Sequence, residues 1–246
     1  MKTRRLLLLL VKAAVAILVI GAAGLTIWAK VGEREAKGTA MAALQSSDMV
    51  TVSQEEWIVF QPQGETKLGL IFYPGGLVEA GAYAPILHQI AAEGVLVVIT
   101  PMPLNLAILN TGAADGVIEA FPQITTWIIG GHSLGGAAAA IFTENNPARV
   151  AAIVFWDSYP ANSADLSDNA IAALSIYGTT NGQPNTDNLL DTKHLLPANT
   201  IYVGIEGANH AQFGDYGPQA GDVEAKMSLS EQHMRVFEIM REFMLP

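Results

Sequence analysis

The stretch W-I-I-G-G-H-S-L-G-G, residues 127–136, decides how this chain of 246 residues is expected to fold. It begins as a run of apolar β-forming residues and ends in paired glycines that enclose one histidine and one serine. Residues 134–145, which follow, have the composition of a helix. The stretch therefore predicts a buried strand, a tight turn at Ser133 and a helix, because glycines permit backbone angles and close approaches that other residues resist.

Apolar runs of strand length recur on both sides of this stretch. They lie at residues 57–60, 68–73, 95–99, 150–156, 174–177 and 201–205, and helical patterns lie between them or after them at 82–92, 113–120, 134–145 and 229–244. Fully apolar strands that alternate with helices are typical of a parallel sheet covered on both faces. We therefore expect an α/β fold with a mostly parallel sheet, whose ligands bind at the carboxyl ends of the strands.

The amino-terminal segment differs from the rest of the chain. Residues 1–5 carry three positive charges, and the 24 residues 6–29 are apolar apart from Lys12 and Thr26. A helix of this length is roughly 36 Å long, at ~1.5 Å per residue, and crosses a hydrocarbon core of about 30 Å. Residues 6–29 are therefore expected to contact a membrane as an uncleaved signal-anchor, with a cleaved signal peptide as the alternative.

These patterns predict three parts of the chain and a location for it. The parts are an anchor at 1–30, a tether at 31–52 and an α/β domain at 53–246. The positive start predicts a single-pass protein of the cell membrane with its domain on the extracytoplasmic side. Secretion after cleavage of the signal is the alternative.

Composition excludes several classes of function. The chain has no cysteine, so a thiol nucleophile, a disulfide and a cysteine-ligated zinc are all excluded. Residues 38–246 carry six basic and 21 acidic side chains, a balance that repels nucleic acid. No metal-ligand motif or dinucleotide-binding glycine pattern is present, so we expect no metal and no cofactor.

The turn at residues 131–135 matches the pattern G-x-S-x-G in the context that gives the pattern its meaning, between a strand and a helix. Such a turn presents the Ser133 hydroxyl above the sheet, and the amide of Leu134 points to where an oxyanion would form. A plain glycine-rich turn with a capping serine is the alternative.

The chain resembles the α/β-hydrolase family, and in particular its small dienelactone-hydrolase-like esterase and lipase members. The resemblance rests on G-G-H-S-L-G-G at 130–136, Y-P-G-G at 73–76 and G-A-N-H at 207–210. It implies that Ser133 is the nucleophile and that His210, after the last strand, is its general base. It also implies that the loop after an early strand donates the second oxyanion amide, with Gly76 as the first choice and Leu77 as the second.

The acid of the expected triad does not stand where the family usually has it. At the usual place, after residues 174–177, this chain has Asn181. Three explanations stay open: the acid is Asp157, at the end of the preceding strand; it is Asp187, in the following loop; or the site is a dyad or is impaired. The positions 157, 181 and 187 all lie between Ser133 and His210, so the chain order of serine, acid and histidine is kept.

The predicted function is that of a serine hydrolase that cleaves small carboxylic esters through an acyl-enzyme intermediate. The segment after Asp157 is short, so a lid is expected to be small or absent. Two other functions stay open: a binding module that has lost activity, which Asn181 favours, and an acyltransferase that passes the acyl group to an alcohol or amine.

Overall fold

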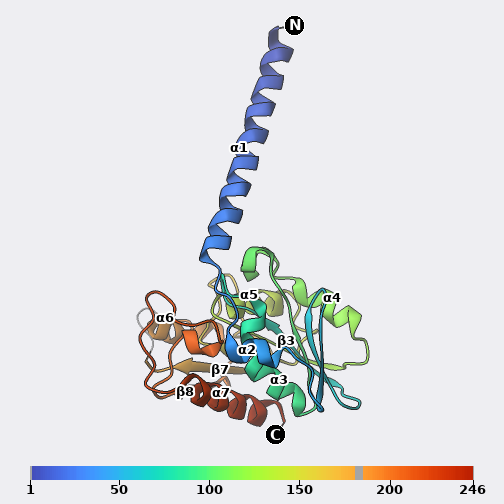
Figure 1. The fold of residues 1–246 in the computed structure, drawn as a ribbon, viewed down its shortest axis with the longest axis vertical. Helices are drawn as coiled ribbons and strands as arrows, with labels where there is room; N and C mark the ends of the chain where they lie inside the picture. The colour runs from blue at the N-terminus through green and yellow to red at the C-terminus, as the bar shows by residue number, and fades with distance from the viewer. Residues whose placement is uncertain (1, 181–184, 246) are drawn as a thin grey trace. The chain divides into compact units, whose positions relative to one another are not determined.

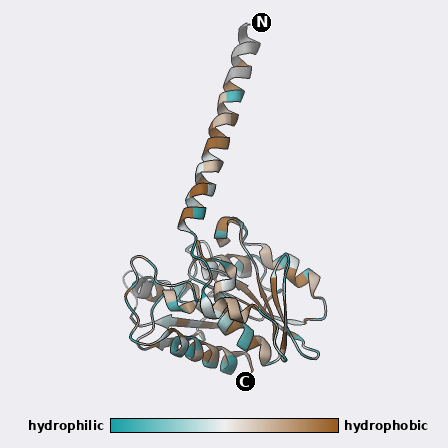
Figure 2. Cartoon of the chain, viewed as in Figure 1, coloured by the Kyte–Doolittle hydropathy of each residue, from teal (hydrophilic) through white to brown (hydrophobic). Residues whose placement is uncertain are grey.

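A computed structural model describes residues 2–180 and 185–245, and the chain divides into two compact units, Met1–Glu33 and Arg34–Pro246. The first unit is the helix α1 (Lys2–Gly32). Within it, Leu10–Gly32 is long and apolar enough to cross a membrane, and none of its most apolar window is buried against protein. Figure 2 shows the hydrophobic turns of α1 in brown. This helix overlaps the expected anchor at 6–29. A signal sequence near the amino terminus can have the same length and apolar composition.

The second unit is built on one eight-stranded sheet (Figure 1). Its strands are β1 (Val50–Gln54), β2 (Ile58–Pro62), β3 (Leu68–Tyr73), β4 (Leu96–Ile99), β5 (Thr126–His132), β6 (Ala152–Trp156), β7 (Ala172–Gly178) and β8 (Ile201–Ile205). The order across the sheet is β1-β2-β4-β3-β5-β6-β7-β8. The pairs β1–β2 and β2–β4 are antiparallel and all the others are parallel, which confirms the predicted mostly parallel sheet.

Helices surround this sheet. The α-helices are α2 (Gly38–Ala43), α3 (Ala84–Ala92), α4 (Ala113–Ala120), α5 (Leu134–Asn145), α6 (Asn185–Asp191) and α7 (Leu229–Met244). Short 3₁₀ turns are η1 (Ala80–Tyr83), η2 (Pro103–Asn105), η3 (Ala107–Leu109), η4 (Lys193–Leu195) and η5 (Ala211–Phe213). The last helix, α7, begins with a capping box in which Ser228 and Glu231 satisfy each other's backbone amides, which fixes its start.

Two apolar clusters form the core, one on each face of the sheet. Alternate residues of β3 enter different clusters, with Leu70 and Phe72 in one and Ile71 and Tyr73 in the other. The first cluster contains buried residues of α3 and α7, and the second contains those of α4 and α5. Both faces of the central strands are therefore buried, which explains why these strands read as continuous apolar runs.

The segment expected to be a tether, residues 31–52, has ordered structure from Arg34 onward. Residues 34–40, which we call the strap segment, begin with a parallel bridge between Arg34 and Val78. The helix α2 and the edge strand β1 follow, so the compact unit begins at Arg34 and not at residue 53. The sequence did not suggest this because residues 34–40 are small or charged and make most of their hydrogen bonds through the backbone.

Candidate active site

Ser133 forms the sharp turn between β5 and α5. Its backbone angles are φ 51° and ψ −122°, which residues with a side chain rarely adopt. Because β5 ends at His132 and α5 begins at Leu134, this single residue makes the turn. The predicted strand, turn and helix are confirmed. A strained serine at this position is typical of a residue whose hydroxyl is presented for chemistry.

Glycines on both sides of the turn let the strand and the helix approach each other. A Cβ on Gly131 would lie 2.4 Å from the carbonyl carbon of Gly135, and one on Gly136 would lie 2.4 Å from Oγ of Ser158. The same Oγ donates a 2.5 Å hydrogen bond to the carbonyl oxygen of Ser133. Ser158, which the sequence analysis did not identify, therefore holds the turn from the end of β6.

Two backbone amides near the turn are available to a ligand. The Leu134 amide lies at the start of α5, where a helix has no acceptor for its first amides. In the loop after β3, the Gly75 amide donates to a tyrosine hydroxyl at 2.9 Å, and the Leu77 amide donates to the Asn105 carbonyl at 2.7 Å. Between them, the Gly76 amide has no acceptor within the described part of the chain. This difference favours Gly76 over Leu77 as a donor.

Asp157 and His210 form a buried pair at the carboxyl ends of β6 and β8. Oδ2 of Asp157 lies 2.5 Å from Nδ1 of His210, and the two side chains are 1% and 7% exposed, respectively. Oδ1 of Asp157 accepts a hydrogen bond from the Gly178 amide at 3.0 Å. Because an ionised carboxylate can only accept, Nδ1 of His210 carries a proton and Nε2 is left as the basic nitrogen.

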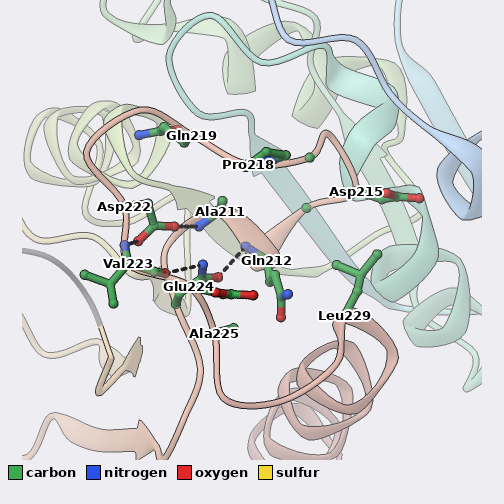
Figure 3. A pocket seen from close by; sticks show the side chains of 13 residues that line it. Ala211, Gln212, Asp215, Pro218, Gln219, Asp222, Val223, Glu224, Ala225 and Leu229 are labelled. Carbon is green, nitrogen blue, oxygen red and sulfur yellow. Dashed lines mark hydrogen bonds between the residues drawn. The ribbon is translucent and has the colours of Figure 1, made fainter.

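Side chains within the loop that carries His210 form hydrogen bonds to the backbone of the same loop. The amide group of Asn209 donates to the Val223 carbonyl at 2.8 Å, and Asp222 accepts from the Ala211 amide at 2.7 Å. Figure 3 shows the bond between Asp222 and Ala211 in the wall of a cavity of about 530 Å³, which residues of this loop line. The position of His210 therefore depends on hydrogen bonds within the loop as well as on Asp157.

A second buried histidine, His132, packs against His210 with 4.4 Å between the ring centroids. Its Nδ1 lies 2.9 Å from the hydroxyl of Tyr83. Burial, and next to it the neighbouring His210, lower the pKa of His132 well below its usual value. His132 is therefore uncharged at neutral pH, and it adds no positive charge beside the proposed base.

A cavity of about 260 Å³ opens beside the turn. Its lining residues are Ser133, Leu134, Ala137, Asp157, Ser158 and Tyr159. The volume lies just below the range of about 300–1,000 Å³ that is typical of small-molecule sites. The turn at Ser133, the start of α5 and the end of β6 thus meet at one small space.

The structure brings most of the predicted site residues together. Ser133 and Asp157 line one cavity, and His210 contacts Asp157. Asn181, at the place where the family usually has its acid, lies outside the described residues. Asp187 is on α6, and its side chain lies outside the described part of the chain. Among the described residues, no three histidine, aspartate or glutamate side chains are grouped so that they would hold a metal ion.

Comparisons with known proteins agree with this architecture. Residues 69–234 match the model of the alpha/beta hydrolase family, which covers more than half of the chain. A search of the curated proteins found no match.

Solved structures share the fold at low sequence identity. A putative lipase from Acinetobacter baumannii has a TM-score of 0.63 and 12% identity, over 84% of this chain and 93% of that chain. A dienelactone hydrolase from Anabaena variabilis has a TM-score of 0.56 and 18% identity, over 80% of this chain and 96% of that chain. Est1E from Butyrivibrio proteoclasticus with ferulic acid bound has a TM-score of 0.58 and 12% identity, over 80% and 97%.

Proposed function

Because this chain belongs to the alpha/beta hydrolase family, we propose that it is a serine hydrolase that cleaves carboxylic esters through an acyl-enzyme intermediate. The observation that carries this proposal is the buried 2.5 Å contact between Asp157 and His210, at the same edge of the sheet as the strained turn of Ser133. Nucleophile, acid and base then stand in the chain order that the family uses, Ser133, Asp157 and His210.

In the proposed reaction, Oγ of Ser133 attacks the ester carbonyl carbon while Nε2 of His210 takes the hydroxyl proton. Asp157 keeps the imidazole in the required tautomer and balances the charge of the imidazolium that forms. The same proton then passes to the leaving alcohol. Water, activated by His210, attacks the acyl-enzyme and releases the acid and free Ser133.

The charge that develops on the substrate oxygen is stabilised by the amides of Leu134 and Gly76. Both amides lack an acceptor within the described part of the chain, and a Cβ on Gly76 would lie 3.2 Å from the Leu134 side chain. The two donors therefore belong to neighbouring residues in space. Loss of one such donor typically lowers kcat by about 10²–10³.

The cavity supports a small ester as the substrate. It measures about 260 Å³, and the segment between β6 and β7 contains no helix, so nothing in that segment forms a helical lid. Among the structural neighbours, Est1E has ferulic acid bound and another protein is a dienelactone hydrolase, and ferulic acid and dienelactones are small molecules. We propose no metal, no cofactor and no nucleic acid in the reaction.

We also propose that residues 6–29 anchor the protein in the cell membrane, with the hydrolase unit on the extracytoplasmic side. The apolar character of Leu10–Gly32 and the positive charges before it support this proposal. Secretion after cleavage is the alternative outcome.

The test is covalent labelling with a fluorophosphonate probe together with hydrolysis of p-nitrophenyl acetate. The wild-type protein should be labelled and should hydrolyse the ester, and Ser133→Ala should abolish both. The exposed Ser167, in the segment after β6, provides a matched control, since Ser167→Ala should change neither. A wild-type protein that is folded but neither labelled nor active would overturn the proposal and favour the binding module. Appearance of the acyl group on an added alcohol instead of water would favour the acyltransferase.

A further inference from the structure

The hydroxyl of Tyr83 connects the loop after β3 with the turn at Ser133. Tyr83 is fully buried, and its hydroxyl accepts a 2.9 Å hydrogen bond from the Gly75 amide. The same hydroxyl lies 2.9 Å from Nδ1 of His132. Gly75 directly precedes Gly76 and His132 directly precedes Ser133, so one hydroxyl contacts both halves of the proposed site.

The direction of these hydrogen bonds follows from the number of protons available. Burial raises the pKa of Tyr83 above its usual value, so the hydroxyl stays protonated. The Gly75 amide can only donate, so among the hydroxyl's partners in the described part of the chain only Nδ1 of His132 can accept its single proton. Burial lowers the pKa of His132, so its ring is neutral. With Nδ1 as an acceptor, the ring proton lies on Nε2, which is buried and has no hydrogen-bond partner among the described residues.

The ring of His132, held in one orientation by Tyr83, packs directly against the proposed base His210. It packs against His210 at 4.4 Å and stacks on Phe213 at 5.8 Å between ring centroids. A rotation of His132 would therefore displace His210 or open a space beside it, because close-packed interiors have little free volume.

We infer that Tyr83 is a positioning residue of this site, whose two hydrogen bonds fix the Gly76 amide and the His132–His210 ring pair relative to Ser133. This inference rests on the proposed esterase function. Tyr83 touches no substrate in this scheme and acts through its two partners. Its removal should therefore affect the rate of the chemical step more than the binding of a small ester.

The chain offers a matched control in Tyr73. Its hydroxyl is also buried, donates to the Thr111 carbonyl at 2.9 Å and accepts from the Ala114 amide at 2.8 Å. Each tyrosine hydroxyl therefore accepts from one backbone amide, but the second partner of Tyr73 is a backbone carbonyl beside the start of α4 and that of Tyr83 is a ring of the proposed site. Tyr73→Phe and Tyr83→Phe should lose similar amounts of stability, since each leaves one buried amide without its acceptor.

The experiment measures kcat and KM for p-nitrophenyl acetate with the full-length chain in detergent, for wild type, Tyr83→Phe and Tyr73→Phe. We expect kcat of Tyr83→Phe to fall at least about tenfold with KM changed by less than about twofold. We expect Tyr73→Phe to keep kcat within about twofold of the wild type. Equal effects of the two substitutions on kcat would overturn the inference and leave a purely structural role for Tyr83.

A spectroscopic measurement tests the same network independently of turnover. In protein with nitrogen-15-labelled histidine, His132 should show the signals of a neutral ring with bare Nδ1, both in wild type and in Tyr73→Phe. In Tyr83→Phe these signals should change. Unchanged signals would contradict the inference, even with kcat reduced.

The two proposals fail in different ways. If Ser133→Ala abolishes ester hydrolysis but Tyr83→Phe does not slow it, the esterase function stands and the role of Tyr83 is wrong. If the wild type shows no hydrolysis that depends on Ser133, the proposed function fails, and the positioning role that rests on it fails too.

Discussion

Asp157 uses its two carboxylate oxygens for different partners. Oδ1 accepts from the Gly178 amide at 3.0 Å, and Oδ2 contacts Nδ1 of His210 at 2.5 Å. An asparagine keeps an oxygen for Gly178, but it cannot both satisfy that amide and offer an anion to the histidine. The substitution Asp157→Asn therefore separates the chemical role of the carboxylate from its structural role.

We predict that Asp157→Asn lowers kcat for p-nitrophenyl acetate by about 10³–10⁴, as in a related triad where loss of the acid leaves the histidine in the wrong tautomer. Steady-state kinetics and a thermal unfolding curve check this, with the unfolding midpoint expected to change little. Asp187→Asn, at the other candidate acid, should keep nearly full activity. The assignment is wrong if Asp187→Asn is the variant that loses turnover.

Residue-scale features could be predicted only where a motif marks them. Asp157 stood out because it ends an apolar strand, and the carboxyl ends of parallel strands lie at the same edge of a sheet as the loop expected to carry His210. Ser158 and Tyr83 had no such mark, because their hydrogen bonds reach a backbone carbonyl at residue 133 and a ring at residue 132. These partners lie 25 and 49 residues away in the sequence, and only the folded chain brings them together.

At the scale of elements, the turn between β5 and α5 depends on the absence of side chains on its glycines. Gly116, in the exposed part of α4, is different: a Cβ there would lie at an ordinary 3.5 Å from Trp57. At Gly131 a Cβ would lie 2.4 Å from backbone of the first turn of α5, and backbone there cannot move without displacing Ser133.

We therefore predict that Gly131→Ala reduces fluorophosphonate labelling by at least about tenfold, through displacement of the nucleophile. It should also lower the free energy of unfolding by roughly 1–3 kcal/mol, a typical value for overpacking. Gly116→Ala should leave labelling intact and should stabilise the protein slightly, by about 0.4–1 kcal/mol. Urea unfolding and labelling rates measure both effects, and normal labelling of Gly131→Ala would refute the argument.

Elements with a strong pattern were predicted closely. The runs at 68–73, 134–145, 201–205 and 229–244 agree with β3, α5, β8 and α7. The strand β1 was not predicted, because V-T-V-S-Q is mostly polar and exposed and is held by pairing with β2 at the edge of the sheet. The short helix α2 was missed for a similar reason, since its six small residues carry almost no periodicity.

At the scale of the whole molecule, the strap segment, residues 34–40, forms hydrogen bonds with the loops around the proposed site. The Arg34 amide donates to the Leu77 carbonyl at 2.7 Å, next to the proposed oxyanion donor. The Thr39 amide and hydroxyl both donate to Oδ2 of Asp215, at 2.9 and 2.6 Å, in the loop that follows His210. The strap segment thus bonds to both loops that flank Ser133, although it follows directly after α1 in the sequence.

This arrangement predicts different results for two truncations that differ by seven residues. A chain without residues 1–33 should leave the membrane fraction, remain folded and keep kcat within about twofold of the full-length protein, because the compact unit begins at Arg34. A chain without residues 1–40 loses the strap segment as well, and its kcat should fall by at least about tenfold, since both flanking loops lose hydrogen bonds. Membrane fractionation, thermal unfolding and ester hydrolysis measure these outcomes. Equal activity in the two truncated chains would show that the strap segment does not support the site. If expression of the whole chain yields only soluble protein with a shortened amino terminus, a cleaved signal is favoured over an anchor.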